Sequence, residues 1–164
     1  QSMMSRPAGT YTEMSDAFRS NGTAVVAQYF KLKNALVKDQ TAPAKSAAND
    51  LVQLLAKLQS SNLKGSEKSA WEGLSKKFNV AAGKLKSAKD IAELRKHFEQ
   101  LSAEVIFLTE NYGVNLDLVY KDYCPMAFNN KGAYWLSETK EITNPYFGAS
   151  MLACGEVKQT YSKK

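Results

Sequence analysis

Residues 90–113 read DIAELRKHFEQLSAEVIFLTENYG and carry the clearest structural signal in the chain. Apolar residues recur there at three- and four-residue steps, the spacing of one face of an α-helix. Asp90 followed by Glu93 resembles a capping box in which Asp replaces Ser or Thr, and Gly113 is a typical C-terminal stop. The pattern predicts a helix that begins after Asp90 and ends before Gly113. Its apolar face consists of Ile91, Leu94, Phe98, Leu101, Val105 and Leu108.

Three further segments with helical periodicity precede this one. Pro43 suits the first turn of the second, and Ser66 is the expected N-cap of the third. The short linkers favour antiparallel neighbours, so the sequence predicts a mainly α protein, an up-down four-helix bundle. The three apolar faces consist of Val25, Val26, Tyr29, Phe30, Leu32, Leu36 and Val37; of Ala47, Ala48, Leu51, Val52, Leu54, Leu55 and Leu58; and of Trp71, Leu74, Phe78, Ala81, Ala82 and Leu85.

The periodicity changes after Gly113. Apolar residues alternate with polar ones over 114–120, which favours a strand, and 155–161 is a weaker second candidate. Pairing of the two as a short β-hairpin would close the irregular C-terminal segment between them and bring Cys124 close to Cys154. We divide the chain into a loose leader, 1–20, and a single domain, 21–161. The domain comprises the helical bundle, 21–113, and the Cys/Met-containing segment, 114–161.

Composition narrows the class of protein. The 164 residues are 44% hydrophobic and 23% charged, as expected for one globular domain, and no apolar run approaches the roughly 20 residues of a membrane span. The net charge is +6, but only three of the 22 basic residues are arginines and the lysines are interleaved with acidic residues. That pattern is typical of solvated helix faces, so we expect no nucleic-acid binding.

Four soft sulfur atoms lie in the C-terminal segment. Both cysteines of the chain have a methionine nearby, in Cys124-Pro-Met126 and in Met151-Leu-Ala-Cys154. Thiolates and thioethers select soft ions such as Cu(I), so these residues are candidate ligands for Cu(I) or Ag(I). His97, the only histidine, borders an apolar helix face. It is a further candidate ligand, although structural hydrogen bonding is the more common role there. Two cysteines and one histidine are too few for structural zinc.

A disulfide is the other reading of the same cysteines. A Cys124–Cys154 bond would close a loop of about 30 residues and stabilise the fold by roughly 3–4 kcal/mol in the chain-entropy model. The methionines would then be packing residues. The protein would be a disulfide-stapled helical interaction domain without a metal. Its contact surface would lie around the aromatic residues Tyr134, Trp135, Tyr146 and Phe147. No phosphate-binding loop, HExxH or GxSxG motif is present, so we do not expect an enzyme.

The C-terminal motifs resemble those of a known family. They are Cys124-Pro-Met126, Gly132-Ala-x-Trp135-Leu-Ser, Glu141-Ile-x-Asn144-Pro-Tyr-Phe-Gly148 and Met151-Leu-x-Cys154-Gly-x-Val157. In these motifs the chain resembles a bacterial domain family of unknown function that is common in Bacteroidetes. Members occur as small exported proteins and as C-terminal extensions of the periplasmic adaptor subunits of copper/silver efflux pumps. The stretches 29–39 and 95–102 also look like the first and fourth helices of that family.

The resemblance implies a role in handling heavy metals outside the cytoplasm. A protein of this kind would be periplasmic or lipid-anchored at the outer membrane, its signal peptide removed. It would buffer Cu(I) or Ag(I), or pass the ion to an efflux system through an efflux-pump adaptor or another periplasmic protein. By position, Cys124, Met126, Met151 and Cys154 match the sulfur motifs of the family, and His97 matches its Arg-x-His-Phe motif.

Overall fold

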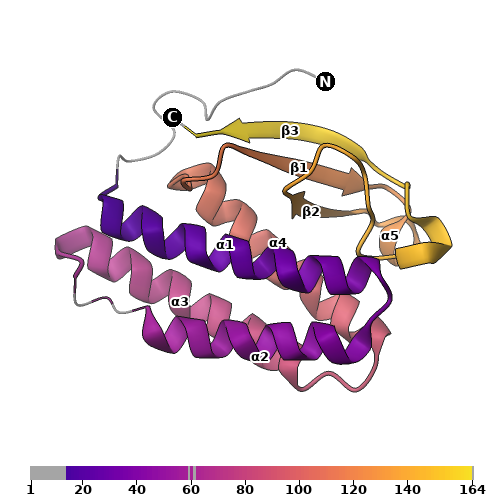
Figure 1. Ribbon diagram of the computed structural model, residues 1–164, viewed down its shortest axis with the longest axis horizontal. Helices are drawn as coiled ribbons and strands as arrows, with labels where there is room; N and C mark the ends of the chain where they lie inside the picture. The colour runs from indigo at the N-terminus through magenta and orange to yellow at the C-terminus, as the bar shows by residue number, and fades with distance from the viewer. Residues whose placement is uncertain (1–13, 59, 61, 164) are drawn as a thin grey trace.

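The computed structural model describes residues 14–58, 60 and 62–163. Four long helices form an up-down bundle, and a small antiparallel sheet lies against the side made by the first and fourth helices (Figure 1). The helices are α1 (Asp16–Val37), α2 (Thr41–Lys57), α3 (Gly65–Lys86) and α4 (Ile91–Asn111). The predicted mainly α bundle is confirmed. Within the described residues, no helix combines the length and apolar character needed to cross a membrane.

The helix ends test the predicted caps. At α4, the Asp90 carboxylate accepts a hydrogen bond from the Glu93 N–H at 2.9 Å. Gly113 has a φ of 79° and donates its N–H to the Thr109 carbonyl, so both predicted signals of α4 are confirmed. The predicted cap of α3 is wrong. That helix begins at Gly65, without a side-chain cap, and Ser66 lies inside it.

The start of α1 corrects the predicted leader. We expected a loose segment through residue 20, but α1 begins at Asp16. The Ser15 hydroxyl accepts the Phe18 N–H at 3.2 Å and so caps the helix. The Phe18 side chain is fully buried, which fixes the first turn on the bundle. The rest of the leader prediction, over residues 1–13, lies outside the described residues.

The bundle core is built from the predicted apolar faces. The ring of Tyr29 in α1 stacks on that of Phe98 in α4, with centroids 5.0 Å apart. Each fully buried large apolar side chain contributes about 1.5–3 kcal/mol relative to an exposed one. Such side chains line every long helix: Val25, Leu32 and Leu36 in α1, Leu51 in α2, Phe78 and Leu85 in α3, and Leu94, Phe98 and Leu101 in α4.

The sheet consists of β1 (Leu118–Cys124), β2 (Ala133–Ser137) and β3 (Glu156–Ser162) in the order β2-β1-β3. β1 pairs antiparallel with both neighbours, and an irregularity between Lys121 and Asp122 interrupts its pairing with β3. The predicted pairing of the first and last strands is confirmed. We predicted a strand from residue 114, but β1 begins at Leu118. The Asn115 N–H donates instead to the Thr23 hydroxyl of α1, which holds a turn at that point.

The chain between β1 and β3 forms the short helix α5 (Ala127–Asn130), the strand β2, the 3-10 helix η1 (Gly148–Met151) and irregular backbone. Polar contacts join this region to the bundle. The Tyr29 hydroxyl lies 2.7 Å from the Ser102 hydroxyl and accepts the main-chain N–H of Leu136 in β2. Lys33, only 1% exposed, forms an ion pair with Glu138. The contact between sheet and bundle is therefore partly hydrogen-bonded.

Arg95 in α4 holds the segment after β2 in place. Its guanidinium donates to the carbonyls of Pro145 and Leu36 at 2.8 and 2.9 Å, and it pairs with Asp39 at 2.7 Å. The second carboxylate oxygen of Asp39 accepts the Ala149 N–H. These hydrogen bonds keep the pKa of Asp39 below its usual range. One arginine thus connects α4, the α1–α2 turn and the segment that leads to Cys154.

Candidate functional site

The two cysteines meet at one end of the sheet. Cys124 is the last residue of β1, and Cys154 lies two residues before β3. Their sulfur atoms are 2.8 Å apart, and the cysteines are not joined. Pairing of Tyr123 with Glu156 brings the two positions together, as the predicted hairpin requires. Cys124 is fully buried, whereas Cys154 is partly exposed. One thiol of the pair is therefore accessible from solvent.

Asn144 organises the turn that carries Cys154. Its side chain is fully buried. The amide nitrogen donates to the Cys154 carbonyl at 2.7 Å, and the amide oxygen accepts the N–H groups of Tyr146 and Phe147. Its own N–H donates to the Leu152 carbonyl. The sequence predicted no anchoring role for Asn144, because its hydrogen-bond partners are set by tertiary packing.

The surroundings of Cys154 favour the protonated form of its thiol. Partial burial raises the pKa of Cys154, and its hydrogen bond to Cys124 raises it further. The main-chain N–H of Met126 acts in the opposite direction, because it donates to the Cys154 sulfur and stabilises the thiolate. A ligand that needs both sulfurs as thiolates must therefore displace protons.

Each methionine of the candidate site lies close in sequence to one of the two cysteines. Met126 follows Cys124 by two residues, and 47% of its surface is exposed. Met151 is the last residue of η1 and is half-buried. Within the described residues, neither thioether accepts a hydrogen bond from a thiol. The structure thus brings the cysteines into contact and leaves about half of the Met126 surface exposed.

His97 lies elsewhere. It lines a surface pocket between α3 and α4, together with Ala81, Lys84, Lys96, Glu99, Gln100 and Ala103. None of the four sulfur-bearing candidates lines that pocket. Without His97, the candidate donors are the two thiols and the two thioethers. The described residues contain no group of three or more His, Cys, Asp or Glu side chains suited to a metal ion. Two thiols fit a soft ion of low coordination number, not tetrahedral zinc.

Comparison with known proteins identifies the family. Residues 25–117 match the model of a protein family of unknown function, DUF3347. The chain belongs to this family. The match begins inside α1 and ends one residue before β1, so both cysteines lie outside it. No curated protein and no solved structure matches the chain.

This DUF3347 chain also carries a buried carboxyl group next to the thiol site. Asp122 lies two residues before Cys124 in β1 and is fully buried. Within the described part of the chain, neither of its carboxylate oxygens has a hydrogen-bond partner. Burial raises the pKa of Asp122 to about 7, and the positive charge of Lys33 partly offsets that rise. The sequence gives no sign of this burial, since a charged residue in a strand is normally exposed.

A left-handed turn directly follows the Cys124-Pro-Met126 motif. Phe128, Asn129 and Asn130 have φ values of 54°, 56° and 65°, a region that costs non-glycine residues energy. Gly132 then has a φ of 83°, and a Cβ there would collide with the Tyr123 ring. The Phe128 ring packs edge-on against Tyr146 at 5.3 Å, which offsets part of the cost. The turn sets the path from the first cysteine into β2.

Proposed function

We propose that this DUF3347 protein binds one soft monovalent ion, Cu(I) or Ag(I), through the thiolates of Cys124 and Cys154. The observation that supports it best is the contact of two unjoined thiol sulfurs, 2.8 Å apart, one buried and one accessible. Thiolates select soft ions, and two of them suffice for an ion that accepts linear coordination.

Binding requires a small opening of the pair. With metal–sulfur bonds of about 2.3 Å, two thiolates on opposite sides of an ion lie about 4.6 Å apart. Cys154 is the residue to move, because it sits in a turn, whereas Cys124 is fixed in the central strand. Both thiol protons leave as the ion enters, so the affinity rises with pH.

The methionines then act during transfer. Met126 is exposed enough to contact an arriving ion or a donor protein, and a thioether holds Cu(I) more weakly than a thiolate does. Met151, three residues before Cys154, is the second such ligand. His97, in its separate pocket, contributes as an outer partner at most.

The cellular role follows from the motif resemblance. We propose an exported, non-enzymatic protein, periplasmic or lipid-anchored at the outer membrane, that buffers the ion or passes it to an efflux-pump adaptor or another periplasmic protein. The support is the Cys-Pro-Met and Met-Leu-x-Cys-Gly motifs, which lie outside the range that matches the family.

The alternative is a disulfide-stapled interaction domain with no metal. The short distance between the sulfurs favours it, because little movement separates them from a bond of about 2.05 Å. The contact surface expected for such a domain needs correction, however. Trp135 is fully buried and Tyr146 is 7% exposed, so a partner could reach only Tyr134 and Phe147 of the four aromatic residues.

One experiment separates the two functions. The reduced protein is titrated anaerobically with Cu(I) against a competing chelator, and free thiols are counted in the protein as isolated. We expect one ion per chain and a loss of affinity of at least a hundredfold in Cys124→Ser and in Cys154→Ser. The double variant Met126→Leu/Met151→Leu is the matched control and should lose much less. Failure to compete for Cu(I), together with no free thiol before reduction, would establish the disulfide instead.

A further inference from the structure

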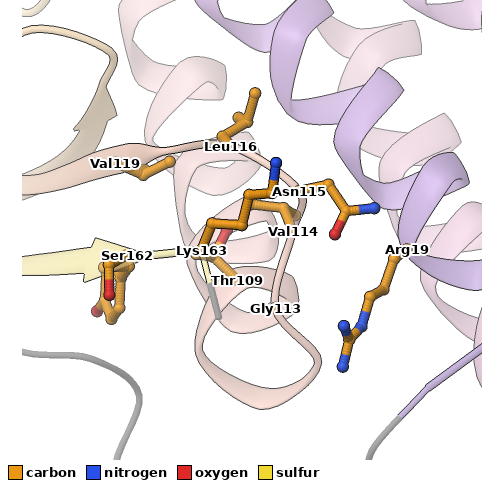
Figure 2. A pocket seen from close by; sticks show the side chains of 10 residues that line it. Arg19, Thr109, Gly113, Val114, Asn115, Leu116, Val119, Ser162 and Lys163 are labelled. Atoms are coloured by element: carbon orange, nitrogen blue, oxygen red, sulfur yellow. The ribbon is translucent and has the colours of Figure 1, made fainter. Parts of the chain in front are cut away.

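A cavity lies at the end of β1 opposite to the thiols. Its volume is about 220 Å³. Arg19 of α1, the 113–116 turn, and Ser162 and Lys163 at the end of β3 contribute to its walls (Figure 2). In Figure 2, Arg19 and Ser162 lie on opposite sides of this turn, and Lys163 lies between them. The remaining described residues of the lining are Thr109, Val119 and Tyr161.

The charge of the cavity is positive. Arg19 and Lys163 line it, and no described acidic residue does. The lining residue Tyr161 donates its hydroxyl hydrogen bond to the Glu110 carboxylate, which is also paired with Lys121 at 3.1 Å. An anion in the cavity would therefore meet two cations and no unpaired described carboxylate in its walls.

Arg19 has an unused hydrogen-bonding edge. Its Nε and Nη2 atoms are both buried, and neither has a hydrogen-bond partner among the residues that the structure describes. These two N–H groups point the same way from the guanidinium plane and match the two oxygens of a carboxylate. Buried donors without acceptors are costly. Because both atoms are shielded from solvent, the Arg19 side chain must turn toward the cavity before this edge can bind a ligand that supplies two oxygens.

The other walls limit the ligand further. Val114, Leu116 and Val119 give an apolar side, while the Asn115 side chain and the Ser162 hydroxyl make no hydrogen bond to described residues. At about 30 Å³ per water, the cavity has room for roughly seven waters, below the usual size of drug-like pockets. Only a small ligand with a short apolar part fits.

We propose that this cavity binds a short aliphatic monocarboxylate, with its carboxylate on Nε and Nη2 of Arg19. The apolar tail lies against Val114, and the positive charge of Lys163 adds attraction. This site goes beyond metal binding and needs neither cysteine.

The test uses the reduced, metal-free full chain labelled with ¹⁵N and titrated with butyrate at low salt. We expect saturable shifts of the main-chain amide signals of Val114, Asn115 and Leu116. Arg19→Gln should weaken binding by roughly ten- to a hundredfold, the range for charge-assisted hydrogen bonds. Arg19→Lys keeps the charge but loses the two-pronged edge, and should weaken binding about tenfold. If Arg19→Gln fails to fold, the affinity of Arg19→Lys for butyrate still tests the site.

Two controls decide the outcome. Lys86→Gln makes the same change in net charge on an exposed position of α3 and should leave the affinity unchanged. The double variant Cys124→Ser/Cys154→Ser should bind butyrate normally, which separates this site from the proposed metal site. Shifts that do not saturate, equal weakening by Lys86→Gln, or equally tight binding of inorganic phosphate at the same amides would each overturn the carboxylate site.

Discussion

The helical bundle and the C-terminal layer of sheet and connecting segments are stabilised in different ways. Buried side chains of the bundle are almost all apolar, and the bundle's buried Lys33 and Ser102 face the C-terminal layer. The smaller C-terminal layer buries four polar residues of its own: Asp122, Ser137, Asn144 and Thr160. The family match, over residues 25–117, covers most of the bundle and ends before the first strand of the sheet. The bundle thus provides a general scaffold, whereas the layer that carries the thiols depends on specific hydrogen bonds.

The largest expected loss of stability comes from replacing a buried tryptophan, of which each region has one. Trp71 in α3 is 1% exposed and Trp135 in β2 is fully buried. Replacing either by Ala should lower the free energy of unfolding by about 3–5 kcal/mol, because a large cavity remains. Urea unfolding followed by helical circular dichroism measures both. If Trp135→Ala leaves the helical transition unchanged, the two regions unfold independently and the C-terminal layer does not support the bundle.

The buried carboxyl group should make stability depend on pH. The pKa of Asp122 is about 7 in the fold and about 3.9 in the unfolded chain. Between pH 4 and 7 the folded state holds a proton that the unfolded state has lost, so stability falls as pH rises through this window. The limit is about 4 kcal/mol, from three pKa units at 1.36 kcal/mol each.

Asp122→Asn should remove that part of the pH dependence and stabilise the protein by about 2–4 kcal/mol at pH 8. Denaturant midpoints at pH 4, 6 and 8 measure the effect. The exposed Asp117→Asn is the control for the change in charge. Identical pH profiles for the natural chain and Asp122→Asn would show that the carboxyl group is hydrated in solution.

A smaller effect is expected at Asn144. Asn144→Ala leaves the Tyr146 N–H and the Cys154 carbonyl without their partners, so the free energy of unfolding should fall by about 1–3 kcal/mol. The turn would also loosen, and Cys154 should react faster with a thiol reagent. Asn79→Ala removes an exposed amide that bonds only its own helix, and both quantities should stay nearly unchanged. Equal thiol reactivity in the two variants would contradict the anchoring role.

The smallest effect concerns the left-handed turn. Asn130 has a φ of 65°, so Asn130→Gly relieves backbone strain and should raise stability by up to about 1 kcal/mol. The same change within a helix, Asn79→Gly, should instead lower stability by a few tenths of a kcal/mol. Thermal unfolding of both variants checks the opposite signs. Destabilisation by Asn130→Gly would mean that the asparagine side chain stabilises the turn.

The same difference between regions explains how much the sequence could predict. Helical periodicity located all four long helices, because each buries one face. β2 was missed because Trp135, Leu136 and Ser137 are all buried in succession, so the strand shows no alternation. The contact of Cys124 with Cys154 followed from strand pairing. The burial of Asp122, the anchoring by Asn144 and the position of His97 depend on tertiary packing, for which the local sequence has no pattern.

The place of the thiols in the sheet has a consequence for its motions. Cys124 ends the central strand, and Cys154 lies just before β3, an edge strand. An ion or a bond between the sulfurs would tie β3 to its neighbour at the Val157 end, while the other end is already held by the buried Tyr161 and by the hydrogen bond from the Lys163 N–H to the Asp117 carbonyl. Amide hydrogen exchange in β3 would then slow near Val157 and change little near Ser162. The exchange rates along one strand would thus report whether the thiols are occupied.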